Sequence, residues 1–157
     1  MKWTVMVLFV AAVYAQSSFG PEYDAVEKSE QEMDRITKDI KDTMRGIPNT
    51  PSAEFACLQN MLIAVGEVNY SLRLYKFSVA MWHSTKTDAD KRVADGILKV
   101  ESDDMKGMIQ RNQKYINETV GAGSQLVPKC VAKGTELLGA IKKADDVLTA
   151  ILNKTKK

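Results

Sequence analysis

One stretch limits the possible folds of this chain more than any other: EFACLQNMLIAVGEVNYSLRLYKFSVAMW, from Glu54 to Trp82. At helical spacing its apolar residues form two overlapping stripes that cover most of the circumference. Such a helix is either buried by several neighbours or embedded in a membrane. Glu67, Arg73 and Lys76 interrupt it, and one charge at the bilayer centre costs about 2.5–3.5 kcal/mol. We therefore interpret the stretch as a buried helix and not as a membrane span.

Three further segments show the 3.6-residue period of amphipathic helices, and no segment shows the alternation of a strand over a convincing length. We expect these helices at residues 22–45, 87–120 and about 124–157. Prolines, glycines and a capping hydroxyl at Thr87 mark the breaks between them. Short connections favour antiparallel neighbours. The sequence therefore predicts an all-α, antiparallel four-helix bundle with a long buried second helix.

The N-terminus has the form of a secretory signal peptide. A basic start and an apolar run are followed by the small-x-small sequence VYA, which ends at Ala15. The apolar run is about half of the roughly 20 residues that a membrane span needs. We therefore expect residues 1–15 to be removed, and residues 16–157 to form a single secreted, extracellular helical domain.

Cys57 and Cys130 are the two cysteines of the chain, and a secreted protein meets an oxidising environment. We expect one disulfide between them, with two buried thiols as the alternative. Both cysteines lie early in their helices, and the second and fourth helices run in the same direction. A disulfide requires Cα atoms about 4.4–6.8 Å apart. The second and fourth helices should therefore touch near this end, with the first helix more peripheral.

Three triplets fit the acceptor pattern for N-linked glycosylation, at Asn69, Asn117 and Asn153. Modification requires exposure of the asparagine. Asn117 lies near a helix end and Asn153 lies in a polar tail, whereas Asn69 lies inside the apolar stretch. We therefore expect a glycoprotein in which Asn117 and Asn153 are the more accessible acceptors.

The chain lacks recognisable catalytic or cofactor-binding clusters. Its single histidine, His83, lies in a polar segment, and we interpret it as an exposed turn residue without the partners that nucleophilic catalysis needs. Adjacent carboxylates such as Asp103 and Asp104 point in different directions from a helix and do not converge on a metal. We therefore expect no enzyme activity, no cofactor and no metal. A glycosidase that uses paired carboxylates is the alternative that the sequence leaves open.

Charge is placed unevenly along a chain whose formal net charge is +2. Residues 22–42 hold eight acidic and four basic residues, and residues 129–157 hold seven basic and three acidic ones. Either the two helices complement each other, or the lysines form a basic face for an acidic partner. The balanced total gives no reason to expect nucleic acid. The candidate partner-binding residues are Lys142, Lys143, Lys154, Lys156 and Lys157.

Two functions of different classes fit such a chain. The first is an interaction protein that binds an extracellular macromolecule through its surface. The second is a carrier that holds a lipid, pheromone or sterol inside the bundle, beside the apolar second helix. The residues that would line such a cavity are Met61, Tyr75, Phe77, Met81 and Trp82. We favour the first function because the sequence lacks the convergent polar groups that ligand pockets usually have.

The chain resembles small all-helical secreted proteins of arthropod saliva and haemolymph, such as the anopheline salivary complement inhibitors. The resemblance rests on the VYA-type signal, the length, the four helices and the single disulfide. The resemblance is one of overall format and transfers no site residue. It implies that the chain inhibits a host defence or clotting protease complex by binding to its surface.

Overall fold

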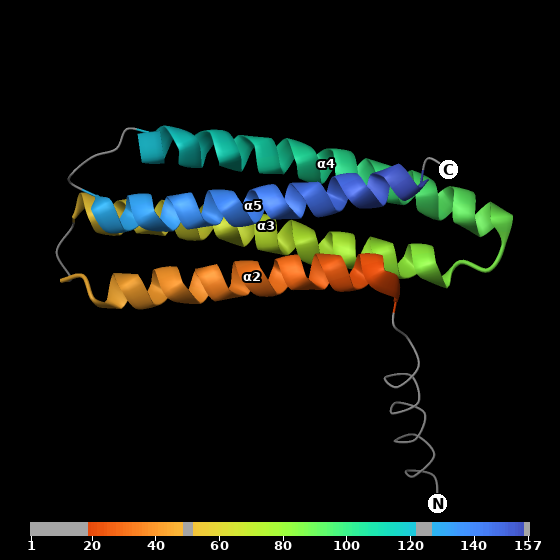
Figure 1. Ribbon diagram of the computed structural model, residues 1–157, viewed down its shortest axis with the longest axis horizontal. Coiled ribbons are helices and arrows are strands. Elements are labelled where there is room, and N and C mark those ends of the chain that lie inside the picture. The colour runs from red at the N-terminus through yellow and green to blue at the C-terminus, as the bar shows by residue number, and fades with distance from the viewer. Residues whose placement is uncertain (1–18, 49–51, 122–126, 156–157) are drawn as a thin grey trace, which may run out of the picture.

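A computed structural model describes residues 19–48, 52–121 and 127–155. These residues form four helices and no strand: α2 (Gly20–Arg45), α3 (Ala53–Ser84), α4 (Asp88–Gly121) and α5 (Pro128–Thr155). The helices lie side by side in alternating directions (Figure 1). The predicted all-α, antiparallel four-helix bundle is therefore confirmed. The predicted signal peptide, residues 1–15, lies outside the described residues.

Local sequence signals place the helix starts. Pro21 lies in the first turn of α2, where a missing backbone N–H costs nothing. The hydroxyl of Ser52 caps α3 by accepting a hydrogen bond from the backbone N–H of Phe55 at 3.1 Å. The hydroxyl of Thr87 accepts from the backbone N–H of Asp90, also at 3.1 Å. The predicted cap at Thr87 is therefore confirmed at the start of α4.

One apolar core runs along all four helices, because each helix contributes a stripe at helical spacing. The largest fully buried side chains are Met33, Ile36, Ile40, Leu58, Met61, Leu72, Tyr75, Leu98, Ile109, Ile116, Leu137 and Ile141. Burying a side chain of this size contributes about 1.5–3 kcal/mol. The core is therefore the main source of stability, and it holds the four helices in one arrangement.

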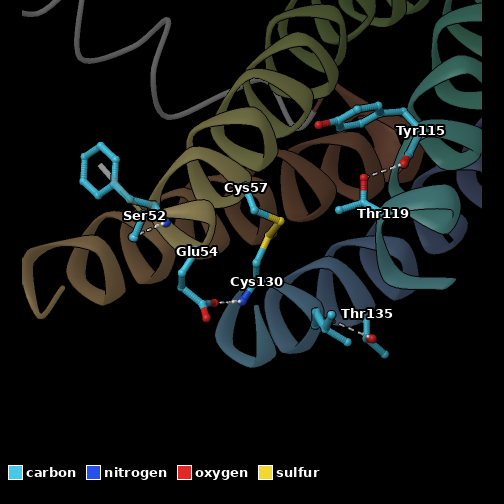
Figure 2. Close-up of a disulfide and its surroundings, with 9 residues drawn as sticks. Ser52, Glu54, Cys57, Tyr115, Thr119, Cys130 and Thr135 are labelled. Carbon is cyan, nitrogen blue, oxygen red and sulfur yellow. Dashed lines mark hydrogen bonds between the residues drawn. A yellow bond between two sulfur atoms is a disulfide. The ribbon is translucent and has the colours of Figure 1, made fainter. Parts of the chain in front are cut away.

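The Cys57–Cys130 disulfide joins the start of α3 to the start of α5, with Cα atoms 6.0 Å apart (Figure 2). Beside it, the carboxylate of Glu54 accepts a hydrogen bond from the backbone N–H of Cys130 at 2.6 Å. α3 and α5 are in contact, and over the described residues α2 and α4 each contact both of them but not each other. The predicted contact between the second and fourth helices is confirmed. The expectation that the first helix is more peripheral agrees with these contacts, because α2 and α4 flank the central pair of α3 and α5 from opposite sides.

Ion pairs attach α2 to both of its neighbours. Arg73 and Lys76 of α3 pair with Glu30, the arginine at 2.9 Å. Arg35 of α2 pairs with Glu136 of α5 at 2.6 Å. Partly exposed pairs of this kind contribute about 0.2–1 kcal/mol each. Lys133 of α5 also pairs with Asp39 of α2 at 3.4 Å, so the acidic charge of α2 is compensated by α3 as well as by α5.

Candidate functional site

One face of α3 is open to solvent, although α3 contacts all three other helices. Its exposed apolar side chains are Ile63, Tyr70, Leu74, Phe77 and Met81, with exposed fractions of 37–67 %. They follow one another at seven, four, three and four residues, so they form a single stripe along the helix. The interpretation of this stretch as a helix surrounded by the others is therefore wrong on this side. All three neighbours lie toward the core, and they leave the outer side uncovered. Among the described residues, no helix has the length and hydropathy that a membrane crossing requires.

α4 continues this apolar surface. Val93, Ile97 and Val100 are exposed by 63, 36 and 62 %, and they are also spaced by four and three residues. A groove of about 490 Å³ lies between the C-terminal end of α3 and the start of α4, lined in part by Met81, Val93 and Ile97. We call the surface made by Tyr70, Leu74, Phe77, Met81, Val93, Ile97 and Val100 the α3–α4 face.

A second groove, of about 420 Å³, lies between α2 and the same end of α3. Phe19, Tyr23 and Phe77 line it together with Met81, which also borders the first groove. The turn of α3 that carries Phe77 and Met81 therefore forms a ridge between two shallow grooves. A ridge with an aromatic side chain and a groove on each side is a shape that another protein surface can enclose.

Two polar contacts hold α3 and α4 together beneath this face. The hydroxyl of Ser102 donates to the hydroxyl of Tyr75 at 2.9 Å, and the exposed fractions of the two residues are 0 and 1 %. Burial raises the pKa of Tyr75 to about 12, although the hydrogen bond with Ser102 acts in the opposite direction. Near the end of the bundle, the indole N–H of Trp82 donates to the carboxylate of Asp95 at 2.6 Å. These contacts place the two apolar stripes in a defined register.

The residues predicted to line an interior cavity do not gather around one. Met61 and Tyr75 are fully buried within the packed core. Trp82 is partly buried and packs against that core. Phe77 and Met81 are on the outer side of α3, with exposed fractions of 67 and 37 %. The structure therefore places these five side chains on both sides of the helix, two of them in the α3–α4 face.

Three of the five lysines predicted to form a basic face lie among the described residues. Lys142 and Lys143 are exposed, but adjacent positions on a helix point about 100° apart. Lys154 pairs with a carboxylate of α2. Lys156 and Lys157 lie outside the described residues. Lys143 and Lys154 are eleven positions apart and lie on nearly the same side of α5, so the basic face remains a prediction.

His83 is not the free turn residue that the sequence predicted. It lies in the last turn of α3, and its Nε2 is 2.9 Å from a carboxylate oxygen of Glu22. The other carboxylate oxygen accepts from Lys154, and this hydrogen bond is the main reason that the pKa of Glu22 is lowered. Gly20, with φ of +83°, packs on the imidazole so closely that a Cβ there would lie 2.5 Å from the ring. This cluster clamps the ends of three helices, and its members are too far apart in the sequence for pattern reasoning to find.

The candidate glycosylation sites differ in exposure. Asn117 on α4 and Asn153 on α5 are exposed. Asn69 has an exposed fraction of 9 %, and its amide donates to the carboxylate of Asp34 at 2.6 Å. In the folded chain Asn117 and Asn153 are therefore accessible to solvent, whereas Asn69 is held between α2 and α3, and glycosylation stays a prediction.

Among the described residues, no three His, Cys, Asp or Glu side chains come together in a group that could hold a metal ion. Comparison of the chain with protein-family models, with curated proteins and with solved structures gives no match. The exposed apolar surface of the bundle includes Tyr70, Leu74 and the exposed side chains of α4, which were missed in the sequence. The apolar residues on the outer side of α3 repeat at four-and-three spacing, but its buried residues do so too, so the spacing alone does not show which side is uncovered.

Proposed function

We propose that this protein is a secreted, non-enzymatic binding protein that engages an extracellular protein partner through the α3–α4 face. The observation that carries this proposal is the exposure of seven large apolar side chains on one face, at 36–67 % each. With about 150–250 Å² for a fully exposed large side chain, their exposed parts amount to roughly 700 Å². The largest apolar patch of a typical monomer is about 300–600 Å² and is often functional.

The composition of the face supports a protein partner. Binding energy at protein interfaces is concentrated in a few central residues, with aromatic ones prominent among them. Tyr70 and Phe77 are the two most exposed side chains of the face, at 65 and 67 %, and Phe77 borders the groove between α2 and α3. The intramolecular disulfide is compatible with secretion. The resemblance to arthropod salivary inhibitors would make the partner a component of a host defence or clotting protease complex.

The carrier function has no comparable support, because its candidate residues are divided between the core and the outer side of α3. Met61 and Tyr75 belong to a core in which side chains from all four helices are in contact. A carrier would need these residues to border the same space as Phe77 and Met81. The proposed function therefore assigns Phe77 and Met81 to the outer binding surface.

A capture experiment tests the proposal. The wild-type protein, the double variant Leu74→Asp/Phe77→Asp and the control variant Ala132→Asp are immobilised and exposed to extracellular fluid from the natural setting of the protein. Ala132 is an exposed residue of α5, so the control adds charge away from the face. We expect wild type and control to retain the same protein, and the double variant to retain it at least about tenfold less, because central anchor residues each contribute about 2 kcal/mol or more. Equal retention by the double variant, with unchanged circular dichroism, would refute the assignment of this face.

A further inference from the structure

The α3–α4 face contains both a ridge and a groove. The ridge is the turn of α3 that carries Phe77 and Met81, and the groove of about 490 Å³ is bordered by Met81, Val93 and Ile97. A dimer with two-fold symmetry requires one surface patch that complements a copy of itself. The exposed apolar stripe of α3 meets this requirement, because an antiparallel copy presents the same side chains in the reverse order.

The spacing along α3 fits a second helix. Apolar residues that repeat with an average of 3.5 residues pack as knobs against a partner helix. The exposed stripe from Tyr70 to Met81 has this repeat, with steps of four, three and four residues. A second copy brings the same stripe on its own α3. If the two helices run antiparallel and cross close to Leu74, Tyr70 of each copy lies beside Phe77 of the other.

The area and the charge of the face suit a dimer. Roughly 700 Å² of exposed apolar surface is close to the ≈ 800 Å² that each partner contributes to a standard interface. The charged residue next to Leu74 is Arg73, and it is paired within its own chain with Glu30 at 2.9 Å and Asp34 at 3.2 Å. The formal net charge of the whole chain is only +2, so repulsion between two copies is weak.

We propose that in the free protein a second copy of this chain covers the α3–α4 face, with the two α3 helices packed antiparallel about a two-fold axis near Leu74. Because the same face is assigned to partner binding, the regulatory meaning of this dimer rests on the proposed function. Self-association keeps the apolar face out of water, and a partner protein must displace the second copy before it binds. The dimer is therefore the resting form, and the amount of free face depends on protein concentration.

Sedimentation equilibrium from about 1 to 100 µM tests the dimer. We expect wild type and Ala132→Asp to reach twice the mass of the chain, and Leu74→Asp/Phe77→Asp to remain at the mass of one chain with unchanged circular dichroism. A wild-type protein that stays monomeric over the whole range would overturn the inference. So would a dimer that is equally stable in the double variant, because its interface would then lie elsewhere.

A symmetry test gives an independent readout. Both native cysteines are held in the disulfide, so a new cysteine reports contact between copies. Leu74→Cys, close to the proposed axis, should form a covalent dimer under mild oxidation, because a residue near a two-fold axis approaches its own copy. Ala132→Cys should not, and the opposite pattern would overturn the inference.

A monomer that still captures an extracellular protein through Phe77 refutes the dimer alone. A dimer that captures none refutes the proposed function alone.

Discussion

Removal of the Tyr75 hydroxyl tests whether the interior beside α3 is packed and dry. Tyr75 and Ser102 are exposed by 1 and 0 %, and their hydroxyls are hydrogen bonded at 2.9 Å. Tyr75→Phe removes one partner and leaves the Ser102 hydroxyl in an apolar site, which costs about 1–3 kcal/mol of unfolding free energy. Ser102→Ala likewise leaves the Tyr75 hydroxyl without its hydrogen-bond partner. The double variant removes both polar groups, so we expect it to cost less than the sum of the two single changes.

The same residue predicts a specific dependence on alkaline pH. Burial raises the pKa of Tyr75 to about 12 in the folded chain, whereas an unfolded tyrosine titrates near 10. The contribution of the neutral phenol is therefore fully present below about pH 10 and is lost as pH rises toward 12, because the unfolded chain releases its proton first. The slope is about 1.4 kcal/mol per pH unit, or roughly 2–3 kcal/mol in all. Tyr75→Phe should lack this part of the alkaline destabilisation.

Urea unfolding followed by circular dichroism measures both effects. The wild type, the two single variants and the double variant are compared at pH 7, and wild type and Tyr75→Phe are compared again at pH 10 and 11. Fully additive costs at pH 7, together with equal alkaline slopes for wild type and Tyr75→Phe, would refute the buried pair. That result would mean that solvent or a ligand reaches Tyr75, as the carrier function requires.

Three further predictions concern the packing and the clamps of the bundle. Gly134→Ala places a Cβ 2.7 Å from a methyl group of α4 and should lower the unfolding free energy by about 1–2 kcal/mol. Gly139→Ala has nothing within 4 Å of its Cβ among the described residues and should raise the unfolding free energy by about 0.5–1 kcal/mol. The reverse order in thermal melts would contradict the close approach of α5. The double variant Cys57→Ser/Cys130→Ser removes a disulfide between residues 73 positions apart. It should lower the unfolding free energy in urea by about 4 kcal/mol, and an unchanged urea midpoint would contradict the presence of the disulfide. Glu22→Gln should cost about 1–3 kcal/mol at pH 7. A hydrogen bond from α5 lowers the pKa of Glu22 below its ordinary 4.5, so its contribution is present above that pH and disappears as pH falls through the folded pKa. Equal losses at pH 7 and pH 2.5 would contradict the clamp.

The sequence was sufficient for the helices and their pairing, because core-facing residues record which side of each helix is buried. Val26, Met33 and Ile36 recur at helical spacing in an otherwise charged segment, and all three are fully buried. The link between Cys57 and Cys130 followed from the presence of two cysteines in a chain with a predicted secretory signal, and the topology agrees with it, since both start helices that run in the same direction. Periodicity and connection length therefore predicted the fold class, and the disulfide predicted the contact between α3 and α5.

The surroundings of α3 could not be predicted in the same way. Tyr70 and Phe77 have the composition of core residues, and hydropathy does not show which side of a helix its neighbours cover. The exposed fractions of 65 and 67 % become apparent only once the three neighbours are placed. The contact of Glu22 with His83 and Lys154 could not be predicted from the sequence either. These residues follow Glu22 by 61 and 132 positions, and their contact depends on how the ends of three helices are aligned. The candidate site is thus a property of the assembled bundle.

Native mass spectrometry of the protein purified from its natural source, followed by organic extraction, tests most directly whether this protein works through its surface or its interior. The filled core and the exposed α3–α4 face predict a mass that corresponds to polypeptide and any attached glycan, without an apolar small molecule. They also predict no displacement of a hydrophobic fluorophore by fatty acid or sterol. A lipid or sterol that co-purifies in a one-to-one ratio, and is lost in a Tyr75 or Met61 variant, would contradict the binding function proposed for the surface.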